Sequence, residues 1–307
     1  MDAGTREVPV AGGPLTVHVL AQAPAEAGTV LALHSISSNG LAWRPLAATL
    51  AGRVSVVAPD MRGRAESSGL RSTGLADHVR DVLAVVDHLG LERPVLAGHS
   101  MGAFVAALAA ASRPDVVGGV LLVDGGLSYP SPGTFDVDEV IHGIIGPAMD
   151  RLTMTFEDPE AHLGHWRAHP TLGPALAGTN GDALAAYLQH DLAGAPGALR
   201  SSSSLECVRA DWTDMMSDPA TLAAVHTLQC PAVLAWAARG PLGLEPGLYS
   251  PARLAEAHLP ADVRTLRLDS DHYGTLLDPA SLDALADALL TLVSGPRSGR
   301  PIHIPVR

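Results

Sequence analysis

The sequence predicts an α/β protein with an eight-stranded, mostly parallel sheet flanked by helices, because short β-branched apolar runs alternate with longer helical patterns. The runs after the opening hairpin are almost uniformly apolar, as strands buried on both faces require. The alternation breaks near residue 130 and resumes near residue 230, which predicts helices inserted between the sixth and seventh strands. With 307 residues and 47% hydrophobic side chains, the chain can bury a large core.

The expected elements follow the chain in order. A hairpin is predicted for residues 6–10 and 15–20 around the turn AGGP. The six further strands are predicted at 29–35, 54–60, 94–100, 119–126, 231–237 and 263–273. Helical spacing is clear in LADHVRDVLAVVDHLG, which ends at the C-cap candidate Gly90, and again in SLDALADALLTLVSG. The predicted organisation is a core domain in two parts, 1–129 and 230–294, a helical cap, 130–229, and a C-terminal tail, 295–307.

Composition narrows the function classes. The formal net charge is −12 and arginine supplies every basic side chain, so a cationic surface for nucleic acid is not expected. The first residues lack the apolar region of a signal peptide, and no run of about 18 apolar residues occurs, so we expect a cytoplasmic protein without membrane contact. Cys207 and Cys230 are interpreted as core thiols. A homo-oligomer is left open.

The stretch GHSMG, residues 98–102, carries the strongest chemical signal. Ser100 stands between a predicted strand and the helical run 101–112, and a β-carbon at Gly98 or Gly102 would collide with neighbouring backbone. The helix beginning there directs free N–H groups and its positive dipole end toward the serine hydroxyl. Ser100 is therefore predicted to be a nucleophile, and the Met101 amide is predicted to stabilise negative charge on a substrate oxygen.

With that motif in its setting, the chain resembles the α/β-hydrolase superfamily from the opening hairpin to the helix ending near residue 294. The segment LALHSISSNGLAW resembles the family's HG loop, which supplies a second oxyanion donor, with Ser35 in place of the usual glycine. By position the donor is the Ile36 amide, and Ser35 is a further candidate. The segment APDMRGRAESSG resembles D-x-R-G-x-G-x-S, in which Asp60 and Arg62 are interpreted as loop-bracing residues.

The resemblance also implies a general base. In DSDHYGTLL, His272 directly follows the last predicted strand, where the family keeps its catalytic histidine. A base for Ser100 must come from a loop at the same edge of the sheet. His99 and His34 are near that edge as well, but their motif neighbours indicate packing and loop-bracing roles.

The acid departs from the family pattern. Relatives commonly end the penultimate strand in a W-G-x-x-D stretch, whereas this chain reads WAARG at 236–240, without an aspartate. The predicted acid is Asp124, at the end of the strand in LLVDGGL, because some relatives carry the acid there. Turn capping is the alternative role of Asp124. Glu245 is the second candidate for the acid.

A serine nucleophile predicts acyl transfer to water, with an ester or lactone as substrate. The resemblance disfavours dehalogenases and epoxide hydrolases, which carry an aspartate at the elbow. The large cap and displaced acid resemble lactone hydrolases of the zearalenone type, so a macrolactone is one version of the prediction. The alternatives are a C–C bond hydrolase, a cofactor-free haloperoxidase-like enzyme, or a slow-turnover receptor for small molecules.

The predicted cap supplies candidates for an apolar roof over Ser100: Met149, Met154, Phe156, Trp166, Tyr187, Trp212, Met215 and Met216. Four of these are predicted to bind substrate: Trp166, Trp212, Met154 and Tyr187. In HLGHWRAHP, three histidines, His162, His165 and His169, share a predicted helix face that is interpreted as solvated or pocket-lining. The stretch RSSSSLE is interpreted as a loop or helix N-cap. We expect neither a metal ion nor another cofactor.

Overall fold

The computed structural model describes residues 4–128 and 136–295 and contains an eight-stranded sheet in the order β1-β2-β4-β3-β5-β6-β9-β10. Its strands are β1 (Gly4–Val10), β2 (Gly13–Ala21), β3 (Thr29–Leu33), β4 (Ser55–Pro59), β5 (Val95–His99), β6 (Gly119–Val123), β9 (Ala232–Ala237) and β10 (Val263–Leu268). β1 and β2 form an antiparallel hairpin, β2 pairs antiparallel with β4, and the other neighbours are parallel. The predicted α/β class and mostly parallel sheet are confirmed.

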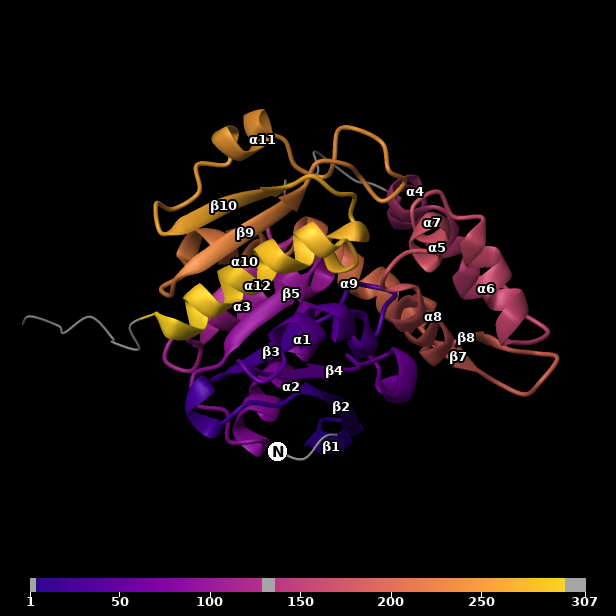
Figure 1. The fold of residues 1–307 in the computed structure, drawn as a ribbon, viewed down its shortest axis with the longest axis horizontal. Helices are drawn as coiled ribbons and strands as arrows, with labels where there is room; N and C mark the ends of the chain where they lie inside the picture. The colour runs from indigo at the N-terminus through magenta and orange to yellow at the C-terminus, as the bar shows by residue number, and fades with distance from the viewer. Residues whose placement is uncertain (1–3, 129–135, 296–307) are drawn as a thin grey trace, which may run out of the picture.

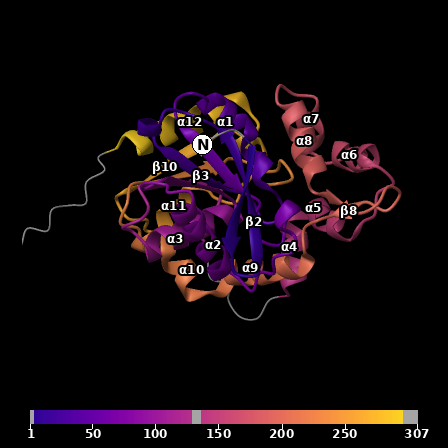
Figure 2. The same cartoon turned by 90° about the horizontal axis from the view of Figure 1, so that it is seen from below.

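Helices cover both faces of the sheet, as Figures 1 and 2 show. One face carries α1 (Arg44–Leu50) and α12 (Pro279–Ser294), and the other carries α2 (Leu75–His88), α3 (Met101–Ser112) and α10 (Pro219–Ala224). The short α11 (Pro251–Glu256) comes between β9 and β10 in the chain. The single-turn 3-10 helices are Ala25–Ala27, Gly40–Trp43, Ala65–Ser67, Arg151–Thr153, Val225–Thr227 and Gly274–Leu276.

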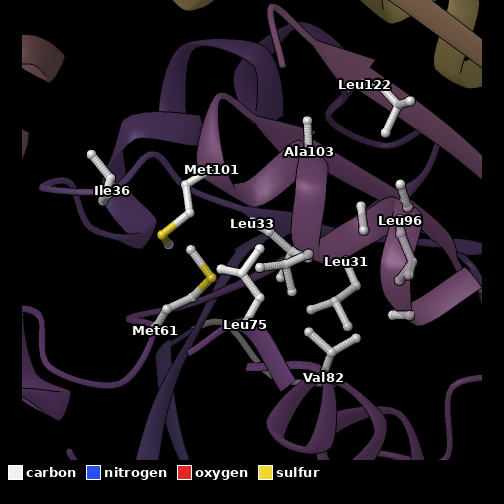
Figure 3. Close-up of a cluster of buried hydrophobic side chains, with 14 of the residues drawn as sticks. Leu31, Leu33, Ile36, Met61, Leu75, Val82, Leu96, Met101, Ala103 and Leu122 are labelled. Atoms are coloured by element: carbon white, nitrogen blue, oxygen red, sulfur yellow. The ribbon is translucent and has the colours of Figure 1, made fainter. Parts of the chain in front are cut away.

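Two hydrophobic clusters hold these layers together. On one side of the sheet, Trp43 and Leu46 pack with Leu285 and Leu289 of α12. The other cluster joins the strands to α2 and α3, and Figure 3 shows Leu31 and Leu33 meeting Leu75, Val82 and Ala103. The two clusters remove apolar surface from water on both faces of the sheet. The central strands are therefore buried on both sides and contain few polar side chains.

The local helix signals agree with the structure. α2 begins at Leu75, the first residue of the predicted pattern, and Gly90 lies just past its end with a φ of +61°. That left-handed conformation is the one a helix-terminating glycine supplies at little steric cost. α3 coincides with the predicted helical run 101–112.

The chain between β6 and β9 forms mainly helices: α4 (Val137–Ile145), α5 (Pro147–Asp150), α6 (Pro159–Arg167), α7 (Leu172–Leu176), α8 (Gly181–His190) and α9 (Leu205–Ser217), followed by α10. Helices α4 to α8 lie beyond the carboxyl ends of the strands (Figure 1), whereas α10 packs against α3. Two-residue strands, β7 (Leu192–Ala193) and β8 (Arg200–Ser201), pair in this region and were not predicted. The predicted domain boundary at 129/130 and nearly all of the tail, 296–307, fall outside the described residues.

The three polar patterns of this region have different outcomes. Ser204 is the N-cap of α9 and accepts a hydrogen bond from the Cys207 amide, as the composition of RSSSSLE indicates. The interpretation of the histidine face as solvated is wrong for two of its members, because His162 and His169 are buried. Both cysteines are free and buried.

Candidate active site

Ser100 occupies a strained turn between β5 and α3. Its backbone has φ 53° and ψ −118°, outside the conformations that residues with a side chain normally adopt. Such strain persists only where the surroundings impose it, and it concentrates at functional sites. The amide of Ser100 donates to the carbonyl of Val123, which fixes the turn to the neighbouring strand β6.

Three glycines make room for this turn. A β-carbon at Gly98 would lie 2.1 Å from the carbonyl oxygen of Gly102, and one at Gly102 would lie 2.1 Å from that of Leu33. The predicted steric need for glycine at both positions is therefore met. Gly125 is a third case, because its β-carbon would lie 2.2 Å from the Ser100 carbonyl oxygen. The sequence motif does not include Gly125, since its contact with the turn arises only when β5 and β6 pair.

His272 and Asp124 meet at the carboxyl edge of the sheet. His272 Nδ1 lies 2.7 Å from Asp124 Oδ2, and both side chains are buried. The other carboxylate oxygen, Oδ1, accepts a hydrogen bond of 3.0 Å from the Ala237 amide at the end of β9. An ionised carboxylate only accepts hydrogen bonds, so Nδ1 carries the shared proton and Nε2 of the neutral ring keeps a lone pair.

Ser100, Asp124 and His272 line one cavity of about 150 Å³, which we call the Ser100 cavity. Ile36 and Trp212 also line it. Among the described residues, no hydrogen bond joins Ser100 Oγ to the imidazole of His272. Catalytic hydrogen bonds are often long before substrate binds. Ser100 and His272 lie in the wall of the same cavity, where a bound substrate would contact both.

The structure treats the two acid candidates differently. Asp124 is fully buried against His272 and has a φ of +43°, another left-handed conformation at this edge. Glu245 is exposed in the loop after β9, and within the described residues it forms no ion pair with His272. The geometry thus brings Asp124, and not Glu245, to the histidine.

The amides of Ile36 and Met101 are both available as donors. Met101 is the first residue of α3, and within the described part of the chain neither amide donates to a protein acceptor. Ser35 does not line the Ser100 cavity. Its carbonyl accepts a hydrogen bond from Nδ1 of His34 at 2.7 Å, and Ser35 lines a second cavity. The loop that carries Ile36 is further fixed because His34 Nε2 accepts from the Met61 amide at 2.9 Å. Burial lowers the pKa of His34 to about 3, so its ring stays neutral.

Arg64 is a residue of this site that the sequence analysis missed. It is fully buried, and its Nε donates to the Ile36 carbonyl at 2.8 Å. Its Nη1 lies 2.6 Å from Asp211 Oδ2 on α9, and its Nη2 lies 3.8 Å from the Met101 sulfur. One guanidinium therefore contacts both residues whose amides are the oxyanion candidates. The arginine stands within the DMRGRA stretch, but nothing in that pattern shows that its side chain turns inward.

The neighbouring motif residues brace loops, as predicted. Arg62 forms a bidentate pair with Asp81 of α2, at 2.6 and 2.7 Å. Asp60 Oδ1 accepts from the Gly40 amide at 2.8 Å.

His99 supports the loop of the candidate base. Its Nε2 lies 3.0 Å from the His272 carbonyl oxygen, and the two rings are 4.6 Å apart. A carbonyl only accepts, so Nε2 of His99 donates. Burial and the nearby His272 lower the pKa of His99 well below its usual value, which keeps its ring uncharged. His99 thus has the packing role expected for it.

The four predicted substrate-binding residues separate into three places. Trp212 lines the Ser100 cavity. Trp166 and Tyr187 line a second cavity of about 50 Å³, the Trp166 cavity, which shares Ile36 and Ile145 with the first. Met154 is 37% exposed and lines neither cavity.

His162 and His165 of α6 and His169, just past its end, do not converge as ligands. His162 Nε2 accepts from the indole N–H of Trp166, and His169 Nδ1 lies 3.2 Å from the Thr171 hydroxyl. Burial lowers the pKa of His162 to about 3 and that of His169 to about 4. These neutral rings pack among aromatic side chains.

Comparison with known proteins agrees with this fold. A family model described as alpha/beta hydrolase fold matches residues 28–171. Lipase LipV of Mycobacterium tuberculosis is 32% identical over 110 residues, which cover 36% of this chain and 42% of that protein. 2-(Acetamidomethylene)succinate hydrolase of Mesorhizobium japonicum is 33% identical over 99 residues, 31% of this chain and 34% of that enzyme. The chain thus spans less than half the length of these curated relatives.

Solved structures match almost the whole chain. E-2-(acetamidomethylene)succinate hydrolase superposes with a TM-score of 0.71 at 22% identity, covering 93% of this chain and 98% of that one. A thioesterase domain from the curacin biosynthetic pathway gives 0.71 at 21%, covering 95% and 100%. The protein therefore has the α/β-hydrolase fold. The family match over residues 28–171 agrees with that fold. In the described parts of the chain, none of the helices has the length and apolarity to span a bilayer.

Proposed function

We propose that the protein is a serine hydrolase that cleaves a carboxylic ester or lactone of a fairly apolar small molecule through an acyl-enzyme. One observation carries the proposal: Ser100, on its strained turn, shares a cavity with a histidine that is hydrogen-bonded to a buried aspartate. A nucleophile, a base and a group that orients the base are the three parts that activation of a serine hydroxyl needs.

In the first half-reaction, Ser100 Oγ attacks the carbonyl carbon and His272 Nε2 takes the hydroxyl proton. Asp124 keeps Nδ1 protonated and stabilises the imidazolium that forms. Collapse of the tetrahedral intermediate breaks the bond to the leaving oxygen. His272 returns the proton to that oxygen, which leaves as an alcohol or, from a lactone, as the hydroxyl end of the opened ring.

The developing oxyanion is stabilised by the amides of Ile36 and Met101. The second amide has the additional advantage of the positive end of the α3 dipole. In the second half-reaction, His272 removes a proton from water, the hydroxide attacks the acyl carbon, and the proton returns to Ser100 as the acid product leaves. Every step uses residues of this chain and water, without a cofactor.

The walls of the Ser100 cavity support an apolar substrate. Trp212, Met215 and Met216 of α9 and Phe104 of α3 line it. We propose that the helices between β6 and β9 act as a cap over the serine and set specificity in this way. At about 150 Å³ and 50 Å³, the two cavities suit a small acyl group better than a macrolactone, which would need the cap to open.

Two further facts support hydrolysis. Matched relatives bear the names of a lipase and of a succinate-derivative hydrolase. Epoxide hydrolase B of Mycobacterium tuberculosis also matches, at 34% identity over 123 residues. A serine at the elbow of the present chain favours acyl transfer over epoxide opening. Attack of the serine oxygen on an epoxide carbon would give an ether, which water does not cleave readily.

The test is burst-phase hydrolysis of p-nitrophenyl butyrate by the purified protein and by Ser100→Ala. We expect an acyl-enzyme burst in the parent and a loss of roughly 10⁴-fold or more in kcat in the variant, as for removal of a serine nucleophile elsewhere. A panel of esters, small lactones and macrolactones then ranks substrate classes by kcat/KM. Tight ligand binding without turnover, or equal turnover by Ser100→Ala, would contradict the proposal.

A further inference from the structure

Three potential metal-binding side chains converge on the outside of the active site. His18 lies on β2, Asp60 follows β4, and His190 ends α8. The Nε2 atoms of His18 and His190 lie 3.1 and 2.9 Å from Asp60 Oδ2, and the three donor atoms are all within 4.8 Å of one another. None of the three residues lines the Ser100 cavity or the Trp166 cavity.

The protein alone leaves this cluster incompletely satisfied. His18 is 8% exposed, and its Nε2 has no hydrogen-bond partner although it lies near Asp60 Oδ2. The distance is suitable, but the geometry is not that of a hydrogen bond. A buried ring nitrogen without a partner costs free energy, so an additional atom that accepts its lone pair would be stabilising.

The carboxylate between the histidines is held in place from behind. Asp60 Oδ1 accepts from the Gly40 amide at 2.8 Å, and Oδ2 accepts a longer contact of 3.3 Å from the Glu66 amide. These contacts direct Oδ2 toward both imidazoles. Backbone support of this kind is what orients a carboxylate that binds a metal.

The donor set and spacing fit a first-row divalent cation. Zinc binds imidazole nitrogen and carboxylate oxygen at about 2.0 to 2.2 Å, so two ligands of one ion at angles near 90 to 110° are separated by roughly 2.9 to 3.4 Å. Both measured N–O separations fall in that range. A donor set of one carboxylate oxygen and two imidazole nitrogens suits such a cation. Of the charged groups around His190, Glu66 favours a cation and Arg44 opposes it.

We propose that His18, Asp60 and His190 bind one divalent transition-metal ion, with zinc as the reference ion, through the two Nε2 atoms and Oδ2. The ion would join α8 to the edge formed by β2 and β4. Tyr187, which lines the Trp166 cavity, is on the same helix, and its carbonyl accepts from the Asn39 side chain at 3.0 Å. The site is structural: it fixes one end of a helix above the candidate active site and takes no part in the chemistry.

The test is isothermal titration of ZnCl₂ into chelator-treated, tag-free full-length protein, alongside His190→Gln and His18→Gln. We expect one ion per chain in the parent and at least a 10-fold weaker affinity in each variant. His142→Gln is the matched control, because His142 faces a single carboxylate, Asp150, at 3.4 Å in an exposed pair, and it should bind zinc like the parent.

Cobalt provides a second measurement that does not depend on activity. Co²⁺ added to the parent should give visible absorption bands typical of a nitrogen- and oxygen-ligated ion, and His190→Gln should lose them. His190 is at a partly exposed helix end, so this variant should fold, which circular dichroism checks. Undetectable binding by the folded parent at about 100 μM zinc, or unchanged affinity in both variants, would overturn the proposal. Neither measurement uses esterase activity, so the metal site can be tested even if the protein does not hydrolyse esters.

Discussion

The carboxyl edge of the sheet and the helices inserted beyond it differ in how their positions are determined. At the edge, the backbone itself specifies each residue: Ser100 and Asp124 both adopt left-handed conformations, and Gly98 and Gly102 leave no room for a side chain. In the inserted region, side chains such as Trp166 are positioned by contacts with other side chains, here by packing and by an indole hydrogen bond to His162. Substitutions at the edge should therefore act on the chemistry, whereas those in the insertion should act on substrate choice.

Apart from replacement of the serine itself, the largest effect is expected at Asp124, the proposed acid. Asp124→Asn removes the acceptor that orients His272, and we expect kcat for p-nitrophenyl butyrate to fall by about 10³- to 10⁴-fold with little change in KM. Glu245→Gln is the matched control, because that side chain is exposed in the loop after β9, and its kinetics should equal those of the parent. Full activity in Asp124→Asn would show that the histidine has another partner.

The next largest effect is expected at Arg64, which connects the Ile36 loop at the sheet edge with α9 of the inserted region. Arg64→Lys keeps a positive charge near Asp211 but cannot also reach the Ile36 carbonyl with a planar fork. We expect kcat to fall roughly 10- to 100-fold while KM changes little, since the fault lies in the position of an oxyanion donor.

Arg71→Lys is the control for this variant. Arg71 also pairs with α9, through Glu206, but both side chains are exposed, so the substitution should change neither constant. Equal losses in the two variants would mean that Arg64 acts only by fastening α9.

A smaller effect is expected within the inserted region. Trp212→Ala enlarges the Ser100 cavity, so the preference between short and long acyl esters should shift toward the longer ones, by about 10-fold in the ratio of kcat/KM. Met154→Ala should leave the ratio unchanged, because Met154 is exposed and lines neither cavity. A shift of the same size in both variants would indicate a general loosening of the helices.

The smallest effect concerns stability at low pH. Although burial acts to raise the pKa of Asp211, the nearby His78 and Arg64 and hydrogen bonds lower it well below its usual range. A carboxyl whose pKa is depressed by folding contributes stability that is present above its unfolded pKa, about 3.9, and lost as pH falls toward the folded value.

The free-energy difference between the parent and Asp211→Asn, measured by urea unfolding, should therefore be constant from about pH 5 to 7. Below about pH 4 it should shrink by roughly 1.4 kcal/mol per pH unit. A difference that stays constant down to pH 3 would show that the ionised carboxylate is not what stabilises this contact.

The parts of the molecule that the sequence predicts are those in which the local backbone conformation restricts which residues can occur. The eight strands, the elbow serine and the helices α2 and α3 follow from periodicity, glycine placement and caps. His272 is predicted from its place after the last strand, at the same sheet edge as Ser100, and Asp124 from the resemblance to relatives that carry the acid after the sixth strand. Gly125 and Arg64 were missed because their contacts, with the Ser100 carbonyl and the Ile36 carbonyl, exist only after distant strands and loops assemble.

The contacts of the inserted helices could not be predicted from the sequence. His162, His165 and His169 have the spacing of a shared helix face, but α6 ends at Arg167, and tertiary packing buries His162 and His169 among aromatic rings. The cluster of His18, Asp60 and His190 has no spacing rule at all, because its members come from three separate elements. Sequence periodicity predicts which face of its own helix or strand a side chain lies on. It does not predict which other part of the protein packs against that face.

Asp124, the carboxylate partner of His272, directly follows β6, so the chain after β9 does not have to supply one. Two contacts tie the end of β9 to Asp124: the Ala237 amide donates to Oδ1 at 3.0 Å, and the Asp124 amide donates to the Ala235 carbonyl at 2.7 Å. We expect residues 239–248 to tolerate changes of length and sequence while the His272–Asp124 hydrogen bond is kept. We expect that loop to accept new recognition elements, since two of its own residues, Pro241 and Leu248, already line the Ser100 cavity.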